Sequence, residues 1–293
     1  MNIIVLSRNA SLYSTQSLVE AARKRNHYVR VLDHMQCDMI IEKGFPCLYY
    51  NFQKLEHVHA VIPRIGTSAT TYGSGVIRQF EAMGVFSTLK AEPLLRARDK
   101  MICLQILAAN GIAIPRTAIS NNLFTISQML DKVGESPHIV KLAHGSQGLG
   151  VILAENKTNA ESILEAFYKI EQRVLVQQFI KEAKGSDVRV FIVDGEIVGV
   201  MKRQAKPGEF RSNIHRGATS SVIKLTSHEE EVVIKAAALM DLSVAGVDML
   251  QSNDGPLILE VNASPGLEGI EATTQVDIAM KIIHYIEKNV QES

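Results

Sequence analysis

Apolar and polar positions change their spacing along the first 85 residues of the chain. Apolar runs of strand length come at 3–6, 28–32 and 60–65, and apolar positions with helical spacing cover about 14–25 and 75–83. Strands that alternate with helices are typical of a unit built on a parallel sheet. We therefore predict an N-terminal α/β domain over residues 1–90.

The pattern beyond residue 90 predicts a second unit. A helix over 100–110 ends at Gly111, and Pro115 opens a new strand. Further helices are expected near 125–133 and 159–170, and strands over 138–142, 151–154 and 174–178. We place a central domain at residues 91–185.

After Gly185 the pattern changes to that of an antiparallel sheet. Strands over 188–193 and 197–203 are separated by Asp194-Gly195, a pair typical of a two-residue primed turn. Helices are expected near 228–240 and 274–288. These elements predict a C-terminal domain at residues 186–293, so the fold class is α/β and α+β.

The most informative polar residues lie in two apolar runs, 245–251 and 256–262, that flank a turn signal. A turn centred near Asp254 would set Asp248 opposite Glu260, with Asn262 on the same strand face. Three oxygen ligands would then converge, which suits magnesium with phosphate oxygens nearby. The alternative is a hairpin with solvated charges. The apolar surroundings favour the metal site, because a buried carboxylate needs a cation.

Composition narrows the class of protein. The chain has 293 residues, 46% of them hydrophobic, and equal numbers of acidic and basic residues, 31 each. Zero net charge does not favour coating of nucleic acid or membrane, so no direct nucleic-acid or membrane partner is predicted. Three cysteines without a CxxC pair fit a reducing compartment. The first apolar run is too short for a signal peptide or membrane span, which predicts a cytoplasmic location.

A glycine-rich segment follows Lys141 and contains Gly145, Ser146 and Gly148. Its glycines would let backbone N–H groups approach a phosphate, although an ordinary glycine-rich hairpin explains the loop equally well. It is neither a Walker loop nor a dinucleotide fingerprint. Lys141 favours the phosphate interpretation, because a lysine in an apolar strand needs an anion.

Two further segments carry candidate chemistry. Basic residues, among them Arg203, Arg211 and Arg216, gather in a loop over 202–217, and guanidinium groups match phosphate or carboxylate oxygens. The strand over 174–178 ends at Gln178-Phe179, which could offer backbone groups and an apolar surface to a purine.

Several motifs in order along the chain resemble the ATP-grasp ligases, and within them the RimK family most closely. They are Arg98-Asp99-Lys100, Val140-Lys141, the 145–150 loop, the 176–180 segment, Phe210-Arg211-Ser212-Asn213, Asp248 and the 260–266 segment, with support from 61–66, 77–80 and 267–271. The resemblance implies an ATP-grasp fold with an N-terminal pre-ATP-grasp domain. It also implies an ATP-consuming α-L-glutamate ligase that adds glutamate to the C-terminus of a ribosomal protein or makes poly-α-glutamate through an acyl-phosphate.

The same resemblance assigns residues to roles. Lys100 and Lys141 would contact ATP phosphates under a loop containing Gly145, Ser146 and Gly148, Gln178 and Phe179 would receive adenine, and Asp187 would hold the ribose. Other nucleotide contacts would come from Arg211, Ser212 and Asn213, and two Mg²⁺ or Mn²⁺ ions would be held by Asp248, Glu260 and Asn262. We expect Arg203, Arg211 or Arg216 to stabilise the tetrahedral oxyanion.

Partners and departures follow from the resemblance too. It implies ATP, L-glutamate and an acceptor peptide or ribosomal protein C-terminus as partners, and a homotetramer. The family commonly has glutamate where this chain has Gln178, an acidic residue where His144 stands, and an acidic-Arg-Arg pattern where Lys202-Arg203-Gln204 stands. A glutamine carbonyl can still accept a hydrogen bond from the adenine amine, so these changes bear mainly on acceptor preference.

Two other functions fit the same residues. One is an ATP-grasp ligase that makes a dipeptide-like or glutathione-like small molecule, which acceptor screening would separate from protein modification. The other is a non-catalytic ATP-binding regulatory protein, which an ADP-release assay would reveal by the absence of turnover.

Overall fold

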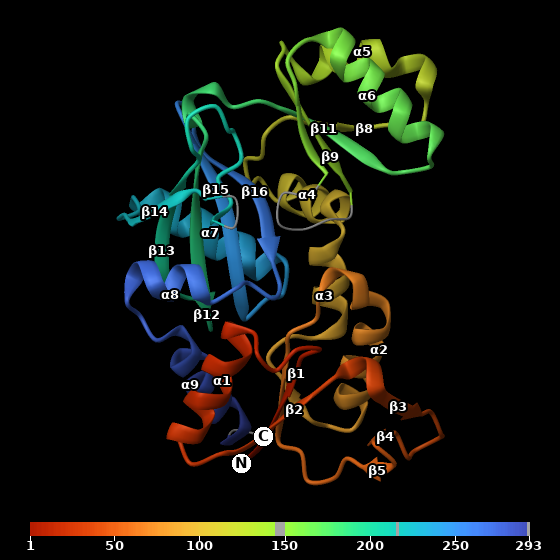
Figure 1. Cartoon of the computed structure of the whole chain (residues 1–293), viewed down its shortest axis with the longest axis vertical. Helices are drawn as coiled ribbons and strands as arrows, with labels where there is room; N and C mark the ends of the chain where they lie inside the picture. The colour runs from red at the N-terminus through yellow and green to blue at the C-terminus, as the bar shows by residue number, and fades with distance from the viewer. Residues whose placement is uncertain (144–149, 215–216, 292–293) are drawn as a thin grey trace.

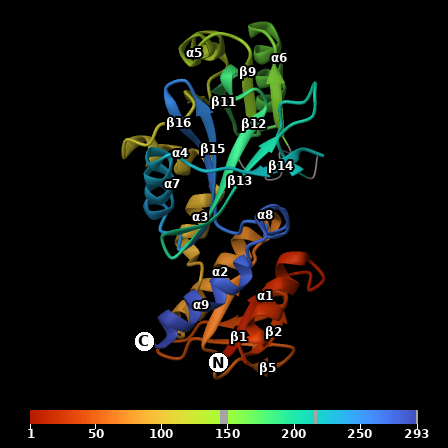
Figure 2. The ribbon, with the colours of Figure 1, turned by 90° about the vertical axis from the view of Figure 1, so that its left-hand side faces the viewer.

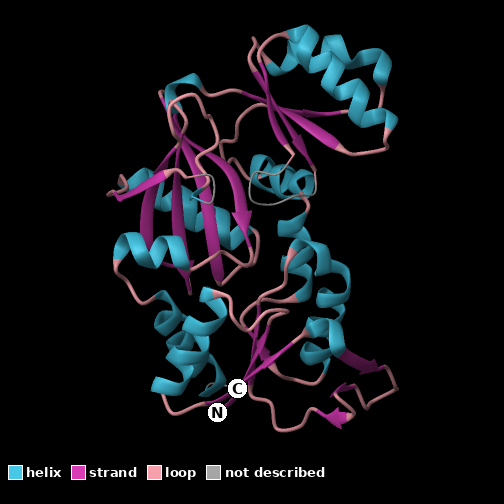
Figure 3. Cartoon of the chain, viewed as in Figure 1, coloured by secondary structure: helices cyan, strands magenta, loops and turns pink. Residues whose placement is uncertain are grey.

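The computed structural model describes residues 1–143, 150–214 and 217–291 of the chain. Its sheets follow one another along the long axis, with the N-terminal unit at one end and the central unit at the other (Figure 1). Helices and strands contribute to all parts of the molecule (Figure 3). The predicted mixed α/β and α+β class is confirmed, whereas the domain boundaries near residues 90 and 185 stay predictions.

The N-terminal sheet has the strand order β2-β1-β6-β7, and all of its pairs are parallel. Its strands are β1 (Asn2–Leu6), β2 (Tyr28–Leu32), β6 (Ala60–Pro63) and β7 (Phe86–Ser87). A parallel sheet is covered on both faces, so its strands are continuous apolar runs. The apolar runs in the sequence therefore predicted β1, β2 and β6 correctly, whereas the two-residue strand β7 was not predicted.

Side chains from β1 go to two different layers. Ile3 and Val5 join a cluster with α1 (Tyr13–Lys24) and α9 (Ile278–Gln291), whereas Ile4 and Leu6 pack with α2 (Thr70–Ala82). The last helix of the chain thus lies beside the first one, at the end of the molecule where β1 also lies (Figures 1 and 2). The N-terminal unit is completed by residues from the far end of the sequence.

The chain segment that connects β2 to β6 forms a small, separate antiparallel sheet, which was not predicted. It consists of β3 (Cys37–Ile40), β4 (Cys47–Tyr50) and β5 (Gln53–Lys54), preceded by the 3₁₀ turn η1 (His34–Gln36). These strands are too short for periodicity to separate them from loop. A second 3₁₀ turn, η2 (Thr67–Ala69), leads into α2.

Two helices connect the N-terminal sheet to the central unit, α3 (Ala91–Arg98) and α4 (Lys100–Ala109). The expected helix over 100–110 is confirmed, and α3 was missed. Asp99 separates the two, because its side chain accepts hydrogen bonds from the backbone N–H groups of Met101 and Ile102. This is the arrangement of a helix N-cap, and it fixes where α4 begins.

The central sheet is antiparallel and has the order β10-β9-β11-β8. Its strands are β8 (Thr117–Ile119), β9 (His138–Leu142), β10 (Val151–Ala154) and β11 (Val174–Gln178), and its helical segments are η3 (Leu123–Thr125), α5 (Ile126–Val133) and α6 (Lys157–Lys169). The helices α5 and α6 cover one face of the sheet (Figure 1). They bury an apolar cluster that is separate from the clusters of the other units.

The C-terminal sheet is also antiparallel, with the order β14-β13-β12-β15-β16. Its strands are β12 (Ser186–Val193), β13 (Glu196–Gln204), β14 (Thr219–Val222), β15 (Val244–Ser252) and β16 (Gly255–Asn262), and its helical segments are η4 (Lys181–Ala183), α7 (Ser227–Leu239) and α8 (Glu268–Thr274). Asp194 and Gly195 both have positive φ angles, 53° and 76°, as the predicted primed turn requires. Within the described residues, none of the helices combines the length and apolar composition needed to cross a membrane.

Truncation of Ile283 tests whether α9 is part of the N-terminal core. Its side chain is fully buried in the apolar cluster that joins α9 to α1 and β1. We expect Ile283→Ala to lower the free energy of unfolding by about 2–5 kcal/mol, measured by urea titration, because the change leaves a cavity. The control is Ile41→Ala, at a position where the isoleucine is 86% exposed and should matter little. Equal losses in the two variants would contradict the packing of α9.

Candidate active site

A cavity of about 1140 Å³ opens between the three units. It is lined by every site residue predicted from the sequence that the structure describes: Lys100, Lys141, Gln178, Phe179, Asp187, Arg203, Arg211, Ser212, Asn213, Asp248, Glu260 and Asn262. Gly145, Ser146, Gly148 and Arg216 lie outside the described residues. Lys100 and Asn262, 162 positions apart in sequence, thus meet at one site.

The hairpin of β15 and β16 pairs Asp248 with Glu260, as the sequence predicted. The turn is not where we expected it, however. Ser252 pairs with Gly255, which shifts the pairing near the turn by one residue from a hairpin centred on Asp254. Leu259 is an extra residue in β16, a β-bulge, and beyond it the expected register returns. The acidic pair therefore depends on the bulge.

Strand alternation gives the C-terminal sheet two chemically different faces. Val188 and Val190 of β12 join the apolar cluster that packs against α7, while Asp187 and Arg189 of the same strand line the cavity. Successive side chains of a strand point to opposite faces, so charges and core residues can share one strand. The same alternation sends Asp248 to the cavity from an otherwise buried strand.

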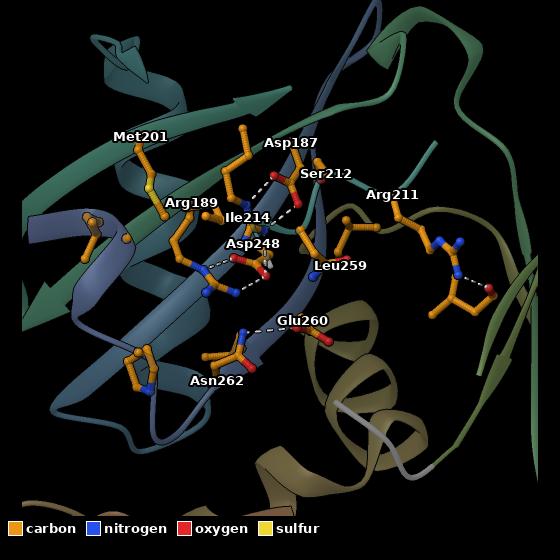
Figure 4. Close-up of a pocket in the computed structure, with 18 of the residues that line it drawn as sticks. Asp187, Arg189, Met201, Arg211, Ser212, Ile214, Asp248, Leu259, Glu260 and Asn262 are labelled. Atoms are coloured by element: carbon orange, nitrogen blue, oxygen red, sulfur yellow. Dashed lines mark hydrogen bonds and ion pairs between the residues drawn. The ribbon is translucent and has the colours of Figure 1, made fainter. Parts of the chain in front are cut away.

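The centre of the site is a network of two carboxylates and two guanidinium groups (Figure 4). Arg189 donates from Nε to Oδ1 of Asp248 at 2.7 Å and from Nη2 to Oδ2 at 2.6 Å. Arg203 donates from Nε to Oδ1 of Asp187 at 2.7 Å, and its Nη2 lies 3.1 Å from Oδ2 of Asp248. The cation that a buried Asp248 requires is therefore supplied by two arginines.

This network sets the charge of Asp248. Burial disfavours the charged carboxylate, but attraction to Arg189 and then to Arg203 outweighs it and lowers the pKa of Asp248 to about 2. The carboxylate stays ionised at neutral pH. Its contacts with the arginines use three of the roughly four hydrogen-bond positions on its oxygens.

Glu260 and Asn262 lie beside this network on β16, and both are only half-buried. Asn262 donates from Nδ2 to Oε1 of Glu260 at 3.1 Å (Figure 4). Among the described residues, no group of three or more His, Cys, Asp or Glu side chains could hold a metal. Two carboxylates and an amide fit magnesium, which takes few protein ligands and completes its shell with water and phosphate. Asp248 would act as the further carboxylate ligand by giving up some of its contacts with Arg189 and Arg203.

Lys141 enters the cavity from β9 of the central unit and is half-buried there. Burial lowers its pKa to about 8, with Glu260 opposing the shift and Lys100 adding to it. A lysine that is desolvated beside another lysine gains most from a bound anion. That an anion binds at Lys141 stays a prediction.

The remaining predicted residues line other parts of the cavity. Gln178 at the end of β11 is exposed and Phe179 is half-buried. Ser212 is buried, while Arg211 pairs with Glu209, with Nη2 2.8 Å from Oε2. The hydrogen bonds from Arg211 lower the pKa of Glu209 to about 2. Arg211 thus lies apart from the Asp248 network (Figure 4), and among the described residues no hydrogen bond or ion pair joins the two.

Sequence reasoning missed one member of the network, Arg189. Its signal was present, since it lies two residues after Asp187 and so on the same strand face. Arg64 and Arg98 also line the cavity, although the sequence suggested no role for them beyond the resemblance. Arg189 lies in β12, Arg64 directly follows β6, and Arg98 ends α3.

Two family models match consecutive parts of the chain. The RimK PreATP-grasp domain matches residues 1–94, and the RimK-like ATP-grasp domain matches residues 97–286. The "Probable alpha-L-glutamate ligase" of Nitrosococcus oceani is 51% identical over 289 residues, 99% of this chain and 96% of that protein. A protein of the same description from Vibrio cholerae is 49% identical with the same coverage.

Solved structures share the fold at low sequence identity. The ATP-grasp ligase PsnB, complexed with a minimal precursor, Mg and ADP, has a TM-score of 0.76 and 20% identity, covering 99% of this chain and 98% of its own. A RimK domain ATP-grasp protein from Sphaerobacter thermophilus has a TM-score of 0.74 and 19% identity, covering 97% and 99%. The two matched domains and the relatives that are about 50% identical, together with the geometry of the cavity, support one assignment. This chain belongs to the RimK family of ATP-grasp proteins.

Proposed function

We propose that this chain is an ATP-dependent carboxylate–amine ligase that adds L-glutamate to the C-terminus of a peptide or protein, with a ribosomal protein as the candidate acceptor. The observation that carries the proposal is the cavity, where Glu260 and Asn262 share one space with Lys141. Oxygen ligands beside a desolvated lysine suit a metal-bound nucleotide. The curated relatives described as probable alpha-L-glutamate ligases support glutamate as the amine substrate.

The proposed reaction has two steps. A carboxylate oxygen of the acceptor attacks the γ-phosphorus of ATP, which forms an acyl-phosphate and releases ADP. The amine of glutamate then attacks the acyl carbon, phosphate leaves, and the amine loses a proton as the amide forms. The protein contributes by positioning reactants and neutralising charge, so it needs no covalent nucleophile.

Lys100 and Lys141 would neutralise the phosphates of ATP. Asp248, Glu260 and Asn262 would hold the divalent metal, Mg²⁺ or Mn²⁺ and two ions in our proposal, which when bound screens the phosphate charge. Gln178 and Phe179 would accept the adenine at the rim. Asp187 would hold the ribose with help from Ser212 and Asn213.

The arginines divide into two roles. The Arg203 side chain is only 4% exposed and is committed to Asp187 and Asp248, which suits it to holding those carboxylates in place. The Arg189 side chain is 18% exposed and reaches the cavity, so it joins Arg211 and Arg216 as a candidate for stabilising the tetrahedral oxyanion. The free cysteines among the described residues fit the cytoplasmic location that we infer. A homotetramer stays a prediction.

Intact mass spectrometry tests the function directly. The purified protein is incubated with ATP, Mg²⁺, L-glutamate and a peptide ending in two glutamates. We expect a ladder on the peptide spaced by glutamyl residues. Glutamate-dependent ADP release without a ladder would keep a ligase and favour a small-molecule acceptor, whereas the absence of both signals would contradict the proposal and favour the regulatory alternative.

Removing the charge of Glu260 tests the metal site. We expect Glu260→Gln to lower kcat by on the order of 100-fold or more. The variant would bind the metal more weakly, and the negative charge developing on the phosphates would then lose the cation that compensates it. ADP release measures the effect, and circular dichroism checks that the fold is kept. The matched control is Glu196→Gln, at an exposed position in β13. Turnover within twofold of the wild type in Glu260→Gln would rule out the metal assignment.

Lys141 gives a prediction about ATP. Lys141→Ala should raise the KM for ATP by on the order of 10-fold or more, since a charged hydrogen-bond donor is lost. Because burial lowers the pKa of Lys141 to about 8, the lysine loses its proton as pH rises through that value, and the wild-type KM for ATP should rise with it.

Two variants control this experiment. Lys141→Arg keeps its charge at all of these pH values, so its KM for ATP should show no such rise. Lys157→Ala removes an exposed lysine that pairs with Asp131, and it should leave the KM unchanged. A KM for ATP that stays constant in Lys141→Ala would remove this lysine from the nucleotide site.

A further inference from the structure

Two arginines that the proposed reaction does not use lie together in the wall of the cavity. Arg64 follows the last residue of β6, and Arg98 is the last residue of α3. Both are half-buried, and the charge of Arg98 lowers the pKa of Arg64. They lie next to the loop after β16, because Arg64 donates from Nη2 to the backbone oxygen of Pro265 at 2.8 Å.

Their place in the N-terminal sheet is one where α/β proteins bind ligands. The strand order β2-β1-β6-β7 reverses direction between β1 and β6. Ligands of open parallel sheets bind outside the carboxyl ends of the strands at such a switch point. The segment 12–15 after β1 and the segment 64–67 after β6 both line the cavity here. The sheet therefore contributes a ligand-binding edge to the same cavity.

The hydrogen bonds of the two arginines leave donors to spare. Arg98 donates to Oγ1 of Thr67 at 3.1 Å and to the backbone oxygen of Ile65. Its Nε is buried and has no hydrogen-bond partner among the described residues. Arg64 makes only its bond to Pro265 within the same described part of the chain. A guanidinium group has five N–H donors, so both arginines retain hydrogen-bonding capacity.

Their charges are also uncompensated by ion pairs. Neither arginine forms an ion pair with a carboxylate in the part of the chain that the structure describes. Burial, and then repulsion from Arg98, lowers the pKa of Arg64 to about 10. Burial also lowers the pKa of Arg98, and attraction to Glu260 only partly opposes that shift. The cost of holding two cations together would be relieved by a bound anion.

We propose that Arg64 and Arg98 form a carboxylate-binding subsite that holds a substrate carboxylate which does not itself react. The guanidinium fork matches a planar carboxylate, and the phosphates of ATP already have Lys100 and Lys141. This inference rests on the proposed function, which requires glutamate and an acceptor carrying carboxylates. The carboxylate could come from the incoming glutamate or from a glutamyl side chain of the acceptor.

The test compares Arg64→Gln with Arg96→Gln. Arg96 lies in α3 like Arg98, but it pairs with Asp241 at 3.6 Å and does not line the cavity. We measure KM separately for L-glutamate, for the acceptor peptide and for ATP. We also measure the ratio of kcat/KM for glutamate over glutamine. Arg64→Lys, which keeps the charge without the fork, should recover part of any loss.

The expected effect in Arg64→Gln is a rise on the order of 10- to 100-fold in KM for one carboxylate substrate, with the KM for ATP unchanged. A rise for glutamate assigns the subsite to the incoming amino acid, and a fall in the glutamate-to-glutamine ratio assigns it to the γ-carboxylate. A rise for the peptide alone assigns it to the acceptor. A change confined to thermal stability, or equal effects in Arg96→Gln, would overturn the subsite.

Calorimetric titration with L-glutamate and with the acceptor peptide, each in the presence of ADP and Mg²⁺, separates this inference from the proposed function. If the wild-type protein forms no amide but binds one of these ligands, and Arg64→Gln weakens that binding, the subsite stands and the proposed function fails. If the wild-type protein forms the amide and Arg64→Gln binds and turns over both ligands normally, the function stands and the subsite fails. Absence of both turnover and binding would reject both.

Discussion

Side-chain alternation along the C-terminal sheet is the constraint on which the site depends. Strand β12 separates an apolar core from a charged cavity, with Val188 and Val190 toward α7 and Asp187 and Arg189 toward the cavity. A one-residue slip in register would exchange the two faces and bury the charges against α7. The bulge at Leu259 matters for this reason, because it sets Glu260 opposite Asp248.

The charges in the cavity are arranged unevenly. At its centre, Asp187 and Asp248 are each paired with arginine, and the network is close to balanced. Lys141 comes from the central unit, Arg64 from the N-terminal unit and Arg98 from the connecting helix α3, and the two arginines lie on a different wall from Lys141. A nucleotide and a carboxylate substrate both carry negative charge, so this distribution suits a site that holds the two side by side.

Packing explains how the walls are held. One apolar cluster runs from the N-terminal sheet through α4 to the C-terminal sheet, and another joins α1 to α9. The central unit has a separate cluster of its own. The wall with Arg64 and the wall with Glu260 are therefore parts of one continuous core, whereas the wall with Lys141 belongs to an independently packed unit. Packing therefore fixes the wall with Arg64 relative to the wall with Glu260 more firmly than it fixes the wall with Lys141 relative to either.

Local pattern determined much of this protein. Apolar runs placed most strands, the 3.6-residue spacing placed most helices, and apolar segments around Asp248 and Glu260 indicated a site, because these signals depend on neighbouring residues alone. Other features required the tertiary structure. The bulge at Leu259 is a pairing between strands, the partnership of Arg189 with Asp248 joins residues 59 apart, and the meeting of Arg64 with Arg98 depends on how β6 and α3 are placed. Contacts between distant segments are decided by packing, which no local pattern records.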